Sequence, residues 1–233
     1  MKRITGFSRL LILIVPAISI LYNQTFAGSD EIGEISFILG EVTIISADSS
    51  AAKNAEINTC IRTGDKILTS GESRCEIKMY DDSVIRLGEN SEFDVNEVTV
   101  KEKTLGGKAK LKCGSLWNNL IKLKTGDKSI KVQTPTSVMA VRGTVFRVDS
   151  QGESSTSVLV YEGAVDVYLS EEVEKTVREN QQRAPGPPKQ VGGPSEVQGP
   201  FEVTLDQWMK IVAGMQIDVR SDGKYHHFEF DKD

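Results

Sequence analysis

The sequence predicts an all-β fold: a multi-stranded β-solenoid or sandwich-like domain with a small helix and two strands as a C-terminal appendage. Between Ile35 and Leu169, short runs rich in Val, Ile, Leu and Thr alternate with glycine and polar turn residues. Their spacing of about 8–12 residues is typical of sandwiches, barrels and solenoids. No helical pattern of about 10–15 residues alternates with these runs, which excludes a doubly wound α/β fold. The pattern does not choose between solenoid and sandwich topology.

Residues 1–27 are predicted to be a signal peptide. Basic residues precede an apolar core at Leu10–Leu21, and Thr25-Phe26-Ala27 resembles a cleavage site. The core is shorter than the roughly 20 apolar residues of a membrane span, and Pro16 interrupts it. We therefore expect export to the periplasm or the extracellular space, with no stable membrane anchor after cleavage. An uncleaved helix that tethers the chain to the membrane is the alternative.

Residues 28–169 are predicted to form the β domain. Turn pairs such as Gly64-Asp65 and Gly126-Asp127 separate its strands. The expected strands are Ile35–Leu39, Val42–Ile45, Arg74–Tyr80, Val84–Leu87, Phe93–Val100, Leu116–Leu123, Ile130–Thr134, Val145–Val148, Ser157–Tyr161 and Ala164–Leu169.

Residues 170–200 are predicted to be a connecting arm rich in proline and glycine. Its first part, residues 170–183, fits either a charged helix or an exposed strand. The second part, residues 184–200, contains Pro-Gly-Pro-Pro and further prolines, which favour an extended conformation of polyproline type.

Residues 201–233 are predicted to form a helix followed by a hairpin. Thr204 and Gln207 have the spacing of a capping box, and apolar residues continue at helical spacing to Val212. Strands are expected at Met215–Arg220 and Tyr225–Phe230. A unit this small is marginal alone, so we expect it to pack on the β domain.

The three cysteines, Cys60, Cys75 and Cys113, form at most one intramolecular pair. They are interpreted as small buried residues, and a Cys60–Cys75 disulfide is the alternative. Cysteine and histidine spacing gives no zinc site, and we predict no metal ion and no cofactor.

Charge and motifs exclude several classes of function. The formal net charge is −5 and basic residues are not clustered, which argues against nucleic acid as a partner because phosphate neutralisation dominates that binding. No hydrolase, metalloprotease or nucleotide-binding motif occurs. His226 and His227 are adjacent on an expected strand and so point to opposite faces. We predict no catalytic residues and no enzymatic activity.

The run Val132–Val148 is the most distinctive part of the chain. Its Arg142 has two interpretations: it grips a carboxylate or phosphate ligand, or it supports a strand corner. Gly143 would give that corner a backbone conformation that other residues avoid. We favour the structural interpretation.

Seven blocks of residues, spread in order over roughly Gly40 to Val167, resemble the FecR domain, the periplasmic part of a bacterial iron-dicitrate signalling protein. The blocks are Gly40–Val42, Gly64–Thr69, Asp82–Leu87, Gly114–Trp117, Thr134–Thr136, Val141–Phe146 and Val160–Val165. The motif residues, interpreted as structural, are Thr134, Pro135, Thr136, Val141, Arg142, Gly143, Thr144, Phe146, Glu162 and Gly163.

The resemblance implies an all-β domain outside a bacterial cytoplasmic membrane, which in the best-known members relays a transporter signal to an anti-sigma segment. Only nine residues precede the apolar core, too few for a cytoplasmic helix that grips a sigma factor. We therefore expect an exported, non-enzymatic binding module whose partner is an envelope protein or a glycan. A membrane-tethered sensor-regulator for iron-uptake-type signalling is the alternative, and a hydrolase built on surface carboxylates is a third hypothesis.

Overall fold

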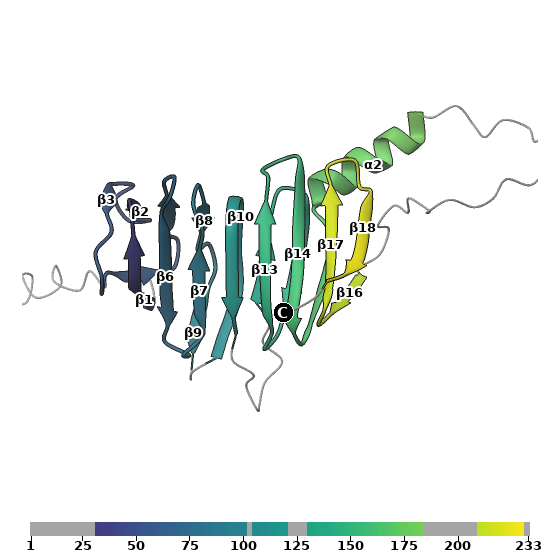
Figure 1. The fold of residues 1–233 in the computed structure, drawn as a ribbon. Coiled ribbons are helices and arrows are strands. Elements are labelled where there is room, and N and C mark those ends of the chain that lie inside the picture. The colour runs from purple at the N-terminus through teal and green to yellow at the C-terminus, as the bar shows by residue number, and fades with distance from the viewer. Residues whose placement is uncertain (1–30, 102–103, 121–129, 184–208, 231–233) are drawn as a thin grey trace, which may run out of the picture.

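The structure is a computed structural model that describes residues 31–101, 104–120, 130–183 and 209–230. Hydrogen bonding divides the strands into two sheets that share one long strand, β10 (Thr104–Asn119). Figure 1 shows the strands side by side, with the helix α2 (Glu171–Arg183) at the C-terminal end of the row. The all-β prediction is confirmed.

The two sheets have the following strands in order of pairing. Sheet A contains β4 (Cys60–Arg62), β1 (Glu31–Leu39), β6 (Arg74–Met79), β7 (Val84–Leu87), β10, β13 (Val145–Ser150), β14 (Ser155–Glu162), β17 (Met215–Arg220) and β18 (Tyr225–Glu229). Sheet B contains β3 (Ala52–Asn54), β2 (Val42–Ile45), β5 (Lys66–Thr69), β8 (Glu92–Asp94), β10, β11 (Ile130–Gln133), β12 (Ser137–Val141), β15 (Ala164–Leu169) and β16 (Met209–Val212). A short strand, β9 (Thr99–Lys101), pairs with the start of β10.

Strand β10 crosses from sheet B to sheet A at Gly114. Before Gly114 it pairs with β8 and β11, and from Gly114 onward it pairs with β7 and β13. Gly114 has a φ of 92°, and a Cβ there would lie 2.4 Å from the Cα of Ser91. Only glycine fits this close approach, because any side chain would meet backbone as well as a strained φ.

The hydrophobic core lies between the two sheets. Alternate residues of each strand point inward, as in β13, where Phe146 and Val148 are buried and Arg147 is exposed. Ile77 of sheet A and Phe93 of sheet B line the same small internal cavity. Each sheet therefore has one buried face and one outward face.

The segment 170–183, for which helix and strand were both open, is a helix from Glu171 onward. The Ser170 hydroxyl accepts a hydrogen bond from the Val173 amide at 3.4 Å, which caps the first turn. Val173 and Val177 are four residues apart and join the core. The first part of the expected connecting arm is thus helical, and residues 184–200 lie outside the described residues.

The helix predicted from Thr204 to Val212 is wrong over its second half. Met209–Val212 is strand β16, which pairs antiparallel with β15. Ile211 alone is buried while Lys210 and Val212 are exposed, so this segment follows the two-residue period of a strand at a sheet edge. The capping box at Thr204 and Gln207 lies outside the described residues.

The hairpin predicted after this helix is present as β17 and β18. Strand β17 also pairs with β14, from Ser155 opposite Arg220 to Leu159 opposite Gln216. The hairpin thus extends sheet A. The expected domain boundaries at 28–169 and 201–233 stay a prediction.

Candidate functional site

Two threonines of the family motif, Thr134 and Thr136, form a buried hydroxyl cluster with Ser137 and Thr156. The Thr156 Oγ1 lies 2.8 Å from the Thr134 Oγ1 and 2.7 Å from the Thr136 Oγ1. All four residues are fully buried. Because Thr156 belongs to sheet A and the others border or belong to β12 of sheet B, the cluster fastens one sheet to the other.

Pro135 lies at the turn between β11 and β12. Its carbonyl oxygen accepts a hydrogen bond from the Ser170 hydroxyl at 2.6 Å. The turn is therefore tied to the residue that also caps α2.

The second half of the motif forms a tight corner between β12 and β13. Gly143 has a φ of 56°, as the sequence predicted, and the Thr144 hydroxyl lies 3.1 Å from the carbonyl oxygens of Arg142 and Ala164. A Cβ on Gly163 would lie 3.2 Å from the Thr144 Oγ1. Backbone acceptors and close packing thus explain these residues.

The remaining motif residues are of two kinds, buried and exposed. Val141 and Phe146 are core residues, whereas Arg142 and Glu162 are exposed. The structural role of the motif stays our interpretation.

The cysteines do not pair, and the Cys60–Cys75 disulfide alternative is wrong in this structure. All three are free thiols. Cys60 and Cys75 lie on β4 and β6, on opposite sides of β1, where they pair with Glu34 and Ile38. Two strand spacings alone separate them by ~10 Å, which is beyond disulfide reach. Burial raises the pKa of the Cys75 thiol to about 12, which keeps it protonated and unreactive.

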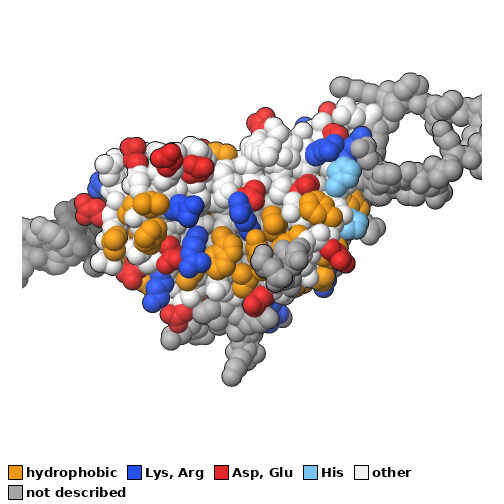
Figure 2. All heavy atoms as spheres, in the orientation of Figure 1, with side chains coloured by type: hydrophobic (Ala, Val, Ile, Leu, Met, Phe, Trp, Pro, Cys, Tyr) orange, Lys and Arg blue, Asp and Glu red, His pale blue; other side chains and the backbone are white. Residues whose placement is uncertain are grey.

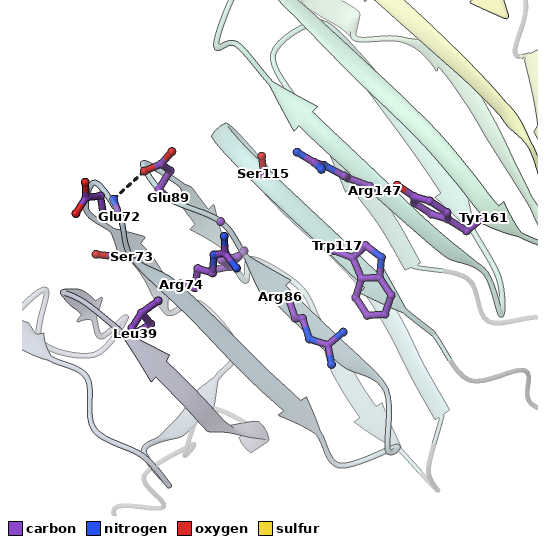
Figure 3. Close-up of a pocket in the computed structure, with 12 residues that line it drawn as sticks. Leu39, Glu72, Ser73, Arg74, Arg86, Glu89, Ser115, Trp117, Arg147 and Tyr161 are labelled. Atoms are coloured by element: carbon purple, nitrogen blue, oxygen red, sulfur yellow. Dashed lines mark hydrogen bonds between the residues drawn. The ribbon is translucent and has the colours of Figure 1, made fainter. Parts of the chain in front are cut away.

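A hollow of about 740 Å³ lies on the outward face of sheet A (Figure 3). Its lining residues come from six strands that are neighbours in sheet A, from β1 to β14, and from the turns beside β6 and β7. Figure 2 shows basic and hydrophobic side chains intermixed across this side of the molecule. We define the arginine hollow by Leu39, Arg74, Arg86, Trp117, Arg147 and Tyr161.

The register of sheet A places the central residues of the arginine hollow directly opposite one another. Trp117 lies directly opposite Arg86 on β7 and directly opposite Arg147 on β13. It faces outward because its neighbour Leu116 is fully buried. The Arg86 Cζ lies 4.5 Å from the centroid of the Trp117 ring, a cation–π contact that positions both side chains.

Two carboxylates hold the arginines from the side. The Arg86 Nε donates to the Glu76 Oε2 at 2.6 Å, and the Arg147 Nε donates to the Asp149 Oδ1 at 3.0 Å. Partial burial opposes ionisation of Glu76, but hydrogen bonds from Ser36 and Arg86 outweigh it and leave the pKa of Glu76 below its ordinary value. Each carboxylate thus takes one edge of its guanidinium.

The terminal nitrogens of Arg86 and Arg147 have no hydrogen-bond partner among the residues the structure describes. Arg74 of β6 lies opposite Leu39 of β1. It forms no ion pair within the same described ranges. These planar donors face solvent and can take carboxylates in the two-pronged geometry that guanidinium favours.

The arginine hollow does not assemble a catalytic triad. Ser115 donates to the Asp149 Oδ1, which places a hydroxyl beside a carboxylate. His226 lies three strands away from Asp149 in sheet A. The cross-strand partners between them are Ser157 and Asp218. Those three strand spacings amount to ~14 Å, far beyond hydrogen-bond reach.

Within the described ranges, no three His, Cys, Asp or Glu side chains are grouped so that they could hold a metal ion. No helix in that part of the chain is long and apolar enough to cross a membrane.

Sequence reasoning missed the arginine hollow as a site, although its residues were visible. Arg86 stands between Ile85 and Leu87, and Trp117 follows Leu116, so alternation alone assigns both to an outward face. The missing information was the register that places them opposite one another.

Comparison with known proteins gives one family and several distant structures. Residues 65–166 match the model of the FecR protein family. No curated protein matches the chain. Two crystal structures of a candidate anti-sigma factor from Parabacteroides distasonis are similar at TM-scores of 0.48 and 0.47, with 15% and 16% identity.

The first of these alignments covers 71% of this chain and 60% of the other, and the second covers 70% and 58%. The chain thus spans about 60% of the length of those structures. A cell surface anchoring domain aligns with a TM-score of 0.27 and 24% identity, over 29% of this chain and 87% of that one. Through the family match, residues 65–166 of this chain are a FecR domain.

Proposed function

We propose that this chain is an exported, non-enzymatic binding module of the bacterial cell envelope, and that its partner contacts the arginine hollow. The observation that carries the proposal is the set of guanidinium donors left without partners around Trp117. A solvated surface without a ligand would need no such alignment, in which two arginines flank one tryptophan across three strands and one of them, Arg86, lies over its indole ring.

Export is supported by the N-terminal sequence, with its basic start, apolar core and Thr25-Phe26-Ala27. The absence of catalysis is supported by the distance between His226 and the Ser115–Asp149 pair, and FecR domains are in general non-catalytic. A membrane-tethered sensor is the second candidate, favoured by the same family match if residues 1–27 are retained.

Site-specific photocrosslinking in the native envelope tests the binding surface. A photoreactive residue replaces Leu39 or Tyr161 in the arginine hollow, or Lys131 or Val138 on sheet B as matched controls. We expect adducts with an envelope component from the first two positions only. Equal adducts from all four positions, or none from the hollow, would overturn the proposal.

The mature N-terminus distinguishes the two candidates. Mass spectrometry of the protein recovered from its native envelope should begin at Gly28. A chain that retains residues 1–27 would instead support the tethered sensor.

A further inference from the structure

We infer that the arginine hollow binds an extended acidic glycan, with a sugar ring against Trp117 and carboxylates on Arg86 and Arg147. The inference rests on the proposed function and names the ligand class for that site.

The location on a sheet face disfavours an extended peptide as the ligand. Strands β7, β10 and β13 are each paired along both edges, so their backbone donors and acceptors are already used. An extended peptide is usually captured by adding a strand to a free edge. A ligand of this face is instead recognised by side chains alone, through ring stacking and guanidinium hydrogen bonds.

The side chains present match an acidic sugar chain. The apolar face of a sugar ring packs on an aromatic ring, and Trp117 and Tyr161 supply such rings in the arginine hollow. A sugar carboxylate accepts two parallel hydrogen bonds from a guanidinium, and the terminal nitrogens of Arg86 and Arg147 are available for this.

The spacing of the arginines sets the spacing of the carboxylates. Arg86 and Arg147 flank Trp117 on the two neighbouring strands, so two strand spacings separate their positions, or ~10 Å. This distance is about the length of one disaccharide in an extended glycan. The ligand class is therefore a glycan with one carboxylate per disaccharide.

Two carboxylates at the rim limit the strength of binding. Glu72 and Glu89 line one end of the hollow, where the Glu89 Oε2 accepts a hydrogen bond from the Glu72 amide at 2.7 Å. Both repel an acidic chain. Because glutamine retains an oxygen acceptor for the Glu72 amide, Glu89→Gln should strengthen binding, by about two- to threefold at low salt.

Calorimetric titration of the mature protein tests the inference with defined probes. The probes are a hyaluronate octasaccharide, which has one carboxylate per disaccharide, a neutral chitin octasaccharide of equal length, and poly-L-glutamate. We expect binding of hyaluronate alone, weakened by salt. Arg86→Ala, Arg147→Ala and Trp117→Ala should each weaken it by about tenfold.

Two variants make the test specific. Arg86→Lys keeps the charge but loses the planar fork, so it should weaken binding nearly as much as Arg86→Ala. Lys131→Ala, on the outward face of sheet B, should leave both binding and thermal stability unchanged.

The outcomes separate this inference from the proposed function. Equal binding of the neutral octasaccharide, preferred binding of poly-L-glutamate, no binding of hyaluronate, or no effect of the arginine variants would each overturn the glycan inference. If Leu39 and Tyr161 then crosslink to an envelope protein, the proposed function stands without it. If they crosslink to nothing, both are wrong.

Discussion

The buried hydroxyl cluster and the arginine hollow are both polar and each brings together residues of several strands, but their hydrogen bonds differ. In the cluster, Thr134, Thr136 and Thr156 satisfy one another within the core. In the hollow, Arg86 and Arg147 are held by one edge and present the other edge to solvent. The hydroxyl cluster joins the two sheets inside the core, whereas the donors that a partner could reach lie on the outward face of other strands, β7 and β13.

Phe146 and Arg147 are neighbours on β13 whose side chains point to opposite faces of the sheet. They therefore give the clearest test of a core role against a binding role. Phe146→Ala should lower the free energy of unfolding by about 3–5 kcal/mol, since it empties a fully buried site. Arg147→Ala should change it by less than about 1 kcal/mol, because its ion pair with Asp149 is half exposed.

Urea titration measures both stabilities, and calorimetry measures both affinities. The expected result is that Phe146→Ala loses stability and keeps affinity at temperatures where it is folded, whereas Arg147→Ala does the reverse. A large stability loss in Arg147→Ala would make the hollow a structural element.

Thr156→Val tests the hydroxyl cluster. Valine keeps the shape but leaves the hydroxyls of Thr134 and Thr136 without their shared partner, which should cost about 1–3 kcal/mol of unfolding free energy. Ser157→Val, at the half-buried next position, is the control and should cost less than about 0.5 kcal/mol. Similar losses from both variants would argue that burial of the strand, and not the cluster, matters.

Acid should affect the support of the arginine hollow and not the hydroxyl cluster, because Glu76, which holds Arg86, is ionisable and has a shifted pKa, whereas the cluster consists of hydroxyl groups. The pKa of Glu76 is lower in the folded protein than in the unfolded chain. Its contribution is therefore present above the unfolded value of about 4.3 and is lost as the pH falls through the lower folded value.

Glu76→Gln should lower the free energy of unfolding slightly at pH 7, where the contribution of the carboxylate is present, and should make stability less dependent on pH in that acid range. Thermal unfolding from pH 7 down to pH 3 measures both effects. The combined variant with Thr156→Val should show the same pH dependence as Glu76→Gln alone. A pH dependence identical to that of the unmodified protein would exclude Glu76 as its source.

The smallest expected effect concerns the reactivity of the thiols. It tests the finding that Cys60 and Cys75 form no disulfide. At pH 8, iodoacetamide should label exposed Cys60 in the native protein, whereas Cys75 should react only after unfolding because it is buried with a raised pKa. Peptide mapping without reductant should find no Cys60–Cys75 bond. Protection of both residues together would restore the disulfide alternative.

Much of the fold was predictable because alternation along a strand is local information. Arg86 and Trp117 each reveal an outward face through buried neighbours. Their alignment was not predictable, because register depends on pairing between residues about 30 positions apart in the chain.

The prediction of a helix at Met209–Val212 was wrong for a related reason. The apolar residues of this segment fit both a helical and a two-residue period over so short a stretch, and the free edge of β15 decides for the strand. The apolar pattern can be read from the sequence, but the free edge of β15 is known only from the structure.

The crossing of β10 at Gly114 has a consequence for how the protein loses its structure. One continuous strand supplies partners to β8 and β11 in sheet B and to β7 and β13 in sheet A. Neither sheet can shed this strand without pulling the other apart, so the two halves should melt as one cooperative unit. A local opening that reached Trp117 would therefore be as rare as global unfolding, and the amides around it should be among the slowest to exchange with solvent.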